Sequence, residues 1–166
     1  FARSWKNLYN PETGWLQSRN PDGSWKSLGE DFRESTYKNY FWMVPYDIAG
    51  LVDIIGGKEE AEKRLDDFFL RLDAGYNDAW FASGNEPSFH IPWVYNWIGR
   101  PYKAQAIVNR VLNEQYSSKI DGLPGNDDLG TMGAWYVFAC IGLYPEIPGV
   151  GGFTVNTPIF SSVKIH

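Results

Sequence analysis

Three stretches of this sequence repeat apolar side chains at the spacing of an α-helix, and this periodicity constrains the fold more than any other feature. Residues 58–72 place apolar side chains on one face and oppositely charged pairs, four residues apart, on the other. A second stretch begins at Pro101, which suits a first helical turn, and a third covers residues 127–143. The three apolar faces are Ala61, Leu65, Phe68, Phe69 and Leu72; Ala104, Ile107, Val108, Val111 and Leu112; and Met132, Trp135, Tyr136, Ala139, Cys140 and Leu143. The pattern predicts a mainly α fold.

Turn-forming residues dominate the segment before these helices. Asn10–Trp15 and Asn20–Trp25 are two similar units, each with Asn-Pro, a glycine and a final tryptophan. Proline presets φ at the second position of a turn, and glycine accepts a positive φ later in it. We therefore expect a turn-rich N-terminal segment.

Two further helical segments are expected between the periodic stretches. Residues 37–55 are apolar in clusters, and Pro45 should break a helix there. After a loop at 73–87, Ser88 is expected to cap a helix that continues to about Ile98.

The end of the sequence has the pattern of strands. Residues 153–155 and 162–165 are predicted to form two short β-strands, and neither has an evident partner in the chain. The sequence also begins at Phe1 in the middle of a pattern. Both features favour a segment of a longer protein.

Charge and hydropathy argue against two classes of partner. The net charge is −5, the pI is near 5.0, and the 15 Lys and Arg residues are scattered, so we expect no nucleic acid. No apolar run approaches the roughly 20 residues of a membrane helix. Cys140 is the single cysteine, which excludes an internal disulfide.

Aromatic residues make up 17% of the chain. Large rings of this kind fill cores. They also stack on the flat faces of sugars, beside carboxylates and amides that bind hydroxyl groups. Composition leaves both interpretations open.

Polar residues gather at three junctions where a loop leads into a helix. At the first junction, Glu34 precedes the aromatic segment that starts at Tyr37. Its carboxylate could cap that helix. Alternatively, a carboxyl among aromatic neighbours keeps its proton and serves as a general acid.

The second and third junctions combine carboxylates with amides. Residues 84–90 contain Asn85, Glu86 and His90, the mixed donors and acceptors that a hydroxyl-rich ligand needs, although a capping cluster would look the same. At the third junction, residues 122–130, two adjacent carboxylates follow an amide and glycines flank them; these residues are Asn126, Asp127 and Asp128. Adjacent carboxylates repel, which implies a cation, a shared proton or solvent access.

These motifs resemble glycoside hydrolase family 92. The resemblance rests on Glu34-Ser35-Thr36-Tyr37, Tyr40-Phe41-Trp42-Met43-Val44-Pro45-Tyr46-Asp47, Gly84-Asn85-Glu86-Pro87-Ser88, and Pro124-Gly125-Asn126-Asp127-Asp128-Leu129-Gly130-Thr131-Met132 with Trp135-Tyr136. The last motif is the most specific. Members of the family are exo-acting, inverting α-mannosidases that require Ca²⁺.

The resemblance implies a fold and a set of partners. Family members join an N-terminal β-sandwich to a C-terminal (α/α)6 toroid, with the active site between them. Residues 1–148 would be part of the toroid, and residues 149–166 would begin the strand region that follows. The implied partners are mannose-containing glycans and the N-terminal β-sandwich of the same protein. A secreted or periplasmic location is implied as well.

The resemblance also implies residue roles. Glu34 corresponds to the general acid and Asp128 to the general base. Asn85 and Glu86 correspond to a pair at the leaving-sugar subsite, and the expected substrate-binding residues are Asn85, Glu86, His90 and Asp127. Calcium would be bound by Asn126 and Asp128.

Two departures leave the substrate open. Many members have Gly-Asn-Ala-Trp-Gln after the acid, where this chain has Ser35 to Asn39. Many also have His-Glu or His-His at the second junction, where this chain has Asn85 and Phe89. The expected reaction is hydrolysis of terminal α-linked mannose, with α-1,2 as the expected linkage. The alternatives are a glycosidase of the same fold that cleaves another bond, and a carbohydrate-binding or scaffold segment without catalysis.

Overall fold

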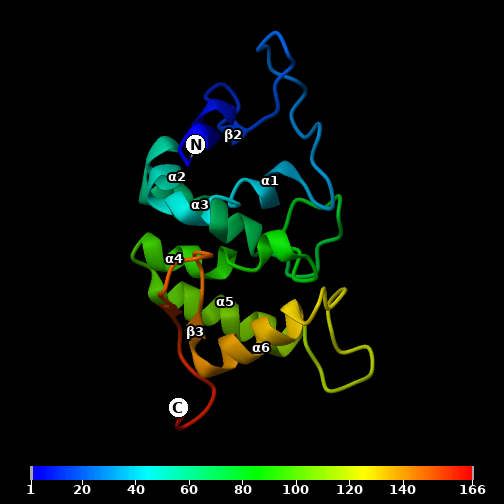
Figure 1. Ribbon diagram of the computed structural model, residues 1–166, viewed down its shortest axis with the longest axis vertical. Coiled ribbons are helices and arrows are strands. Elements are labelled where there is room, and N and C mark those ends of the chain that lie inside the picture. The colour runs from blue at the N-terminus through cyan, green and yellow to red at the C-terminus, as the bar shows by residue number, and fades with distance from the viewer. Residues whose placement is uncertain (1, 166) are drawn as a thin grey trace. The chain divides into compact units, whose positions relative to one another are not determined.

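The computed structural model describes residues 2–165. The chain divides into two compact units, unit 1 (Phe1–Ala82) and unit 2 (Ser83–His166), coloured from blue to green and from green to red in Figure 1. Helices joined by long loops are the main regular structure of both units, in agreement with the mainly α prediction. Within residues 2–165, no helix combines the length and the apolar character needed to span a membrane.

Unit 1 consists of a β-hairpin followed by short helices. Its elements are the 3-10 helix η1 (Ser4–Leu8), strands β1 (Tyr9–Asn10) and β2 (Trp15–Leu16), helix α1 (Tyr37–Tyr40), the 3-10 helix η2 (Pro45–Asp47), and helices α2 (Ile48–Ile54) and α3 (Lys58–Phe68). The two strands are antiparallel, with Tyr9 opposite Leu16. The first predicted turn unit is the loop of this hairpin, where Gly14 has a φ of 75°.

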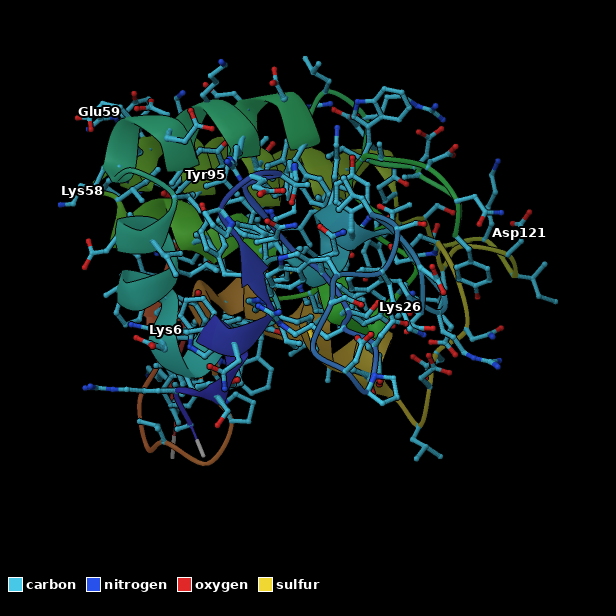
Figure 2. The ribbon with its side chains drawn as sticks, turned by 90° about the horizontal axis from the view of Figure 1, so that it is seen from above. Lys6, Lys26, Lys58, Glu59, Tyr95 and Asp121 are labelled. Carbon is cyan, nitrogen blue, oxygen red and sulfur yellow. The ribbon has the colours of Figure 1, made fainter. Side chains whose placement is uncertain are left out.

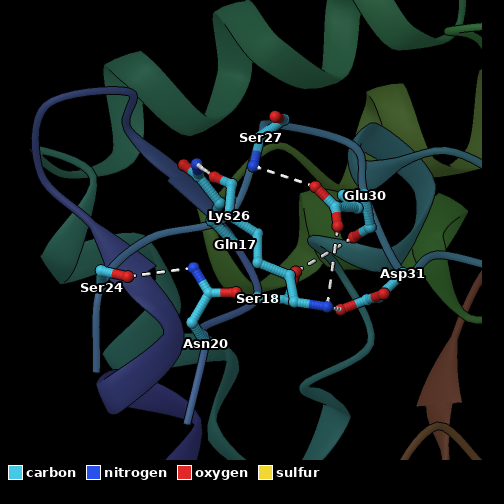
Figure 3. A network of polar contacts seen from close by, with 8 residues as sticks. All are labelled: Gln17, Ser18, Asn20, Ser24, Lys26, Ser27, Glu30 and Asp31. Carbon is cyan, nitrogen blue, oxygen red and sulfur yellow. Dashed lines mark hydrogen bonds and ion pairs between the residues drawn. The ribbon is translucent and has the colours of Figure 1, made fainter. Parts of the chain in front are cut away.

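The second turn unit closes through polar contacts (Figure 3). The Asn20 side-chain amide donates to the Ser24 hydroxyl at 2.9 Å. The Lys26 ammonium forms ion pairs with Asp31 at 2.7 Å and with Glu30 at 3.6 Å. These contacts fix the chain three residues before Glu34.

Helix α3 buries the face that the periodicity predicted. Leu65 is fully buried and Phe68 is nearly so, whereas Lys58 and Glu59 in the first turn extend away from the helix (Figure 2). The prediction that the helix continues to residue 72 was wrong. It ends at Phe68, whose carbonyl oxygen accepts a hydrogen bond from the Phe81 N–H at 3.1 Å.

Pro45 interrupts the helical segment 37–55, as predicted. Val44 has φ −127° and ψ 52°, outside the helical region, as expected for a residue before proline. The Asp47 side chain then accepts from the Gly50 N–H and caps α2. It also accepts from the Trp5 indole N–H at 3.1 Å, which ties the start of unit 1 to α2.

Unit 2 carries the longest helix of the described residues. Its elements are the 3-10 helices η3 (Glu86–Ser88) and η4 (Ile91–Trp93), helices α4 (Val94–Trp97), α5 (Pro101–Glu114) and α6 (Thr131–Ile141), and strands β3 (Leu143–Tyr144) and β4 (Thr154–Val155). Helix α5 starts at Pro101, as predicted. It buries Ala104, Val108 and Val111 on the predicted face.

The helix expected from Ser88 to Ile98 is not continuous. Two 3-10 helices occupy its first half, and only Val94–Trp97 is α-helical. Ser88 is the last residue of η3 and does not cap a helix. Pro92 explains the difference, because it has no backbone N–H to donate to the Ser88 carbonyl, as an α-helix that starts after Ser88 would require.

Both ends of the third helix, predicted at residues 127 and 143, were also mispredicted. Helix α6 begins at Thr131, after Gly130 with a φ of 89°, and stops before Gly142, whose φ is 82°. The chain then reverses, and β3 pairs antiparallel with β4, Leu143 opposite Val155. The segment at 153–155 therefore has a partner, contrary to expectation. Residues 162–165 form no strand in the part of the chain that the structure describes.

Asn156 connects three parts of unit 2. Its side-chain amide donates to the Ala139 carbonyl at 3.1 Å, and its side-chain oxygen accepts from the Trp93 indole N–H at 3.1 Å. Its backbone N–H donates to the Gly142 carbonyl at 3.0 Å. These contacts hold β4 against η4 and the end of α6.

Candidate active site

In unit 2 the backbone brings the second and third polar junctions together at two glycines. A Cβ atom added to Gly84 would collide with the carbonyl oxygen of Pro124 and would lie 3.2 Å from the Gly125 Cα. A Cβ added to Gly125 would lie 2.8 Å from the Gly84 Cα. The chain can make this contact, called here the Gly84–Gly125 contact, only because neither residue has a side chain.

Asp127 and Asp128 follow this contact and differ in their surroundings. The Asp127 carboxylate accepts from the Gly133 N–H at 3.1 Å and so binds a donor in the first turn of α6, whose cap position is held by Gly130. The Asp128 side chain is exposed, and its backbone has a φ of 46°. Leu129 also has a positive φ, 62°, and is fully exposed. Asn126 is exposed as well. All three side chains of the loop are thus exposed, and Asp127 in addition supports the start of the helix.

The second junction is mostly buried. Asn85 and His90 are each 6% exposed, and Ser88 is completely buried. Glu86 is exposed. The Trp135 indole N–H donates to the Phe89 carbonyl at 2.9 Å, which fixes this segment against α6. Asn85 and His90 are therefore rigid polar groups within the packed part of unit 2.

A row of aromatic rings packs beneath the two junctions. Tyr116 stacks on Trp135 with centroids 5.6 Å apart, Trp135 meets Trp93 edge-on at 5.6 Å, and Trp93 stacks on Tyr144 at 4.0 Å. Burial raises the pKa of Tyr116, and the charge of Asp127 raises it further. Burial also raises the pKa of Tyr144, with contributions from the charges of Glu146, Tyr116 and Glu86. Both phenols therefore remain protonated and can donate hydrogen bonds.

In unit 1, Glu34 stands on a bend before α1. Its side chain is exposed and its φ is 63°. Thr36 occupies the cap position of α1, two residues after Glu34. Burial raises the pKa of Tyr40, and the Glu34 charge adds to the shift. The Ser35 hydroxyl is buried and has no hydrogen-bond partner among residues 2–165.

The predicted residues thus fall into two groups. Asn85, Glu86, His90 and the Asn126–Asp128 loop lie in unit 2, whereas Glu34 lies in unit 1. Across the described residues, no three His, Cys, Asp or Glu side chains gather closely enough to hold a metal ion.

Sequence reasoning missed Tyr116 and Tyr144. Tyr116 lies just after α5, at the start of the loop that leads to the third junction, and Tyr144 follows the turn at Gly142. For Tyr116, its position at the start of the loop that leads to the third junction was a signal in the sequence. Nothing local pointed to Tyr144, because its stacking partner Trp93 is 51 residues away in the sequence.

Comparison with known proteins identifies the class. A protein of Arthroderma benhamiae called an uncharacterized secreted glycosidase is 29% identical over 197 residues, which covers 99% of this chain and 24% of that protein. A family 92 α-mannosidase of Bacteroides thetaiotaomicron has a similar structure, with a TM-score of 0.84, 34% identity, and coverage of 93% of this chain and 21% of that one. An inverting family 92 mannosidase of the same species gives a TM-score of 0.84 at 29% identity, over 95% of this chain and 25% of its own.

The family follows from a match over the whole sequence. Residues 1–166 match the glycosyl hydrolase family 92 catalytic domain. The chain therefore belongs to this family of glycoside hydrolases, as its motifs indicated. It spans about a quarter of the length of the relatives described above. Its helical fold agrees with the predicted partial helical toroid.

Proposed function

We propose that the protein to which this chain belongs hydrolyses terminal α-linked mannose residues with inversion of configuration, and that α-1,2 linkages are its substrates. Family membership supports the glycosidase activity. The names of two structural relatives, an α-mannosidase and an inverting mannosidase, support the substrate class and the stereochemistry.

The backbone at the two carboxylates is the observation that carries this proposal. Asp31, Glu34, Asp128 and Leu129 are the only residues other than glycine with positive φ between residues 2 and 165. Such conformations are uncommon for residues with a side chain, and they concentrate at active sites, where the surrounding structure holds them. Two of these four residues are the acid and the base proposed from the sequence.

The proposed mechanism divides the chemistry between Glu34 and Asp128. Glu34 donates a proton to the glycosidic oxygen as the bond to the leaving sugar breaks. Asp128 removes a proton from the water that attacks the opposite face of the ring. An inverting pair works at a separation of about 6.5–9.5 Å, which leaves room for that water. The exposure of both side chains suits groups that must contact substrate.

Substrate contacts are assigned to the polar groups of unit 2. Asn85, His90 and Glu86 would bind sugar hydroxyls, and burial of the first two supports a preorganised site. Asp127 would contribute from the other junction. Because its carboxylate already accepts from Gly133, its second oxygen would face the sugar.

Calcium suits the donor set at the third junction. Asn126 and Asp128 supply exposed oxygen atoms, the ligand type that a hard cation prefers. Two side chains fall short of the six to eight ligands of Ca²⁺, so water, backbone or sugar oxygens would complete the shell. When bound, calcium would hold neighbouring sugar hydroxyls and favour distortion of the ring.

The remaining assignments concern the whole protein. Residues 1–148 would belong to the helical toroid, and residues 149–166 would begin the following strand region. The partner domain would be an N-terminal β-sandwich. A secreted location is proposed from the name of the Arthroderma benhamiae relative.

The test is hydrolysis of α-1,2-mannobiose by the full-length protein, before and after exhaustive chelation with EGTA. We expect mannose release that chelation abolishes and added Ca²⁺ restores. Asp128→Asn should abolish release, whereas Asp121→Asn, an exposed residue of the preceding loop (Figure 2), should not. Full activity after chelation would refute the calcium assignment. Activity only toward other glycosides would support a glycosidase of the same fold that cleaves another bond. No activity at all would support a carbohydrate-binding or scaffold role without catalysis.

A further inference from the structure

Glu146 is a buried carboxyl group without a partner. It is 4% exposed, and neither of its carboxyl oxygens has a hydrogen-bond partner among the described residues. It lines a pocket of about 470 Å³ in unit 2, together with Asn96, Trp97 and Phe153. None of the residues assigned to sugar chemistry lines this pocket.

Unpartnered acceptors are concentrated at this pocket. Four buried side-chain polar atoms lack a hydrogen-bond partner within residues 2–165, and three of them belong to Glu146 and Asn96. The Asn96 amide N–H groups are already used, at 2.7 Å from the Thr154 hydroxyl and 3.1 Å from the Val155 carbonyl. What remains on Asn96 is an acceptor. When Glu146 is ionised, all three unsatisfied atoms are acceptors and require a donor.

The energetic cost of this arrangement is large. A buried carboxylate without a hydrogen bond or counter-charge is strongly unfavourable, and native proteins rarely leave such groups unsatisfied. Burial raises the pKa of Glu146 to about 7. The Trp97 indole and the Thr154 hydroxyl oppose that shift, but neither reaches hydrogen-bonding geometry with the carboxyl group. A donor that also carries positive charge would supply both the missing hydrogen bonds and the missing counter-charge.

We propose that this pocket binds an organic cation, an ammonium or guanidinium group carried on an apolar stem, with the charge at Glu146 and Asn96. The walls fit such a ligand, because Trp97 and Phe153 supply aromatic rings, which attract cations, and Ile147 and Val150 supply apolar surface for its stem. A guanidinium has enough N–H donors for all three acceptors.

The size of the pocket favours an organic ligand over a metal ion. A volume of 470 Å³ lies within the range of about 300–1,000 Å³ that small-molecule sites occupy. A calcium ion requires a compact shell of six to eight oxygen ligands at about 2.3–2.6 Å, which largely apolar walls do not supply.

Access to the carboxyl group requires a side-chain movement. The Glu146 oxygens are shielded from solvent, but Trp97 and Phe153 are 42% and 56% exposed. Rotamer changes of exposed side chains are fast, on the picosecond to nanosecond scale. The proposal therefore includes a rearrangement of these lining side chains when the cation binds.

The cation has two chemically equivalent sources, a free small molecule or a Lys or Arg side chain from elsewhere in the protein. Carbon-13 NMR of the Glu146 carboxyl in the full-length protein separates them. Its signal is assigned by its loss in Glu146→Gln. The pH titration is recorded alone, with n-butylguanidinium, and with n-butylurea, which has nearly the same shape and no charge.

For a free ligand, we expect a pKa of about 7 alone that falls below the ordinary value of 4.5 with n-butylguanidinium and stays unchanged with n-butylurea. For a protein side chain, the value is already below 4.5 with nothing added. A pKa near 7 in every arm, or an equal response to n-butylurea, would overturn the proposal.

Calorimetry provides a second readout that does not depend on the NMR assignment. Glu146→Gln should weaken n-butylguanidinium binding at least about tenfold, equivalent to 1.4 kcal/mol. Glu114→Gln, an exposed residue of α5 that pairs with Arg110, should leave the affinity unchanged. Equal affinities in the wild type and Glu146→Gln would contradict a cation site at this carboxyl.

Discussion

Gly84 and Gly125 lie so close together that neither position has room for a side chain. The contact joins a loop that begins with buried polar residues to a loop that presents two exposed carboxylates. Side chains separated by about forty positions in the sequence therefore share one part of unit 2, and their relative placement depends on the absence of two Cβ atoms.

Alanine at either glycine should disturb both stability and activity. We expect Gly84→Ala to lower the free energy of unfolding by about 1–3 kcal/mol, since the added methyl group forces the backbones apart. It should also reduce kcat/KM of the full-length protein. Gly151→Ala is the matched control, because no atom lies within 4 Å of a Cβ added there. Thermal unfolding and mannobiose kinetics measure the two effects, and equal behaviour of the two variants would contradict the contact.

Asp127 has a structural role that can be separated from sugar binding. Its carboxylate accepts from the Gly133 N–H in the first turn of α6, and Asp127→Ala should cost about 1 kcal/mol of stability, the usual effect of losing one hydrogen bond. Asp127→Asn keeps an acceptor for the Gly133 N–H and should retain most of the stability. If Asp127 also contacts substrate, the asparagine variant will show a raised KM at nearly normal stability. A normal KM would mean that Asp127 supports α6 through the Gly133 N–H and does not contact substrate.

The general-acid role of Glu34 depends on the leaving group. Glu34→Gln should slow hydrolysis of α-1,2-mannobiose by about 10²–10⁴-fold, because the leaving sugar needs a proton. Hydrolysis of α-mannosyl fluoride should change little, because fluoride leaves without one. Glu12→Gln, an exposed residue of the hairpin loop, serves as control. Equal losses on both substrates would rule out the acid role.

Glu146 should make stability depend on pH when no cation is bound. Its pKa is about 7 in the folded state and near 4.5 when exposed, so the folded state holds the proton more tightly. Its contribution is therefore fully present below pH 4.5 and is lost as pH rises through 7, a change of at most about 3 kcal/mol. The nearby Tyr144 remains protonated throughout this range.

Glu146→Gln should remove this dependence. The wild type should lose stability between pH 5 and pH 8, and the variant should lose less. The free energy of unfolding is measured by chemical denaturation at both pH values without added cations. If the free energy of unfolding changes between pH 5 and pH 8 by the same amount in both proteins, Glu146 is not buried as a neutral acid.

The sequence predicted elements whose determinants are local. The apolar face around Leu65 and the start of α5 at Pro101 follow from periodicity and proline geometry within one helix. The failed helix after Ser88 was also a local matter, since Pro92 removes the N–H that would bond to the Ser88 carbonyl. Its failure shows that a proline in the fourth helical position outweighs one favourable capping residue.

Other features depend on contacts between distant residues. The strand β3 was missed because its pairing with β4 requires the reversal at Gly142, whose backbone has no space for a side chain beside Asn156. The polar junctions were recognised from composition, but their contact at Gly84 and Gly125 was not. The lack of a hydrogen-bond partner for Glu146 could not be predicted, because it depends on the absence of donors among residues that only the fold brings near it.

The most direct test of the proposed function is the anomer that the full-length protein releases from α-1,2-mannobiose. Proton NMR, recorded before mutarotation, distinguishes the two anomers. The reducing-end mannose is released at its anomeric equilibrium, so inversion through Glu34 and Asp128 predicts that β-mannose first exceeds its equilibrium share, and that Asp128→Asn abolishes release. An initial excess of α-mannose over its equilibrium share, or no release by the calcium-loaded protein, would contradict the account.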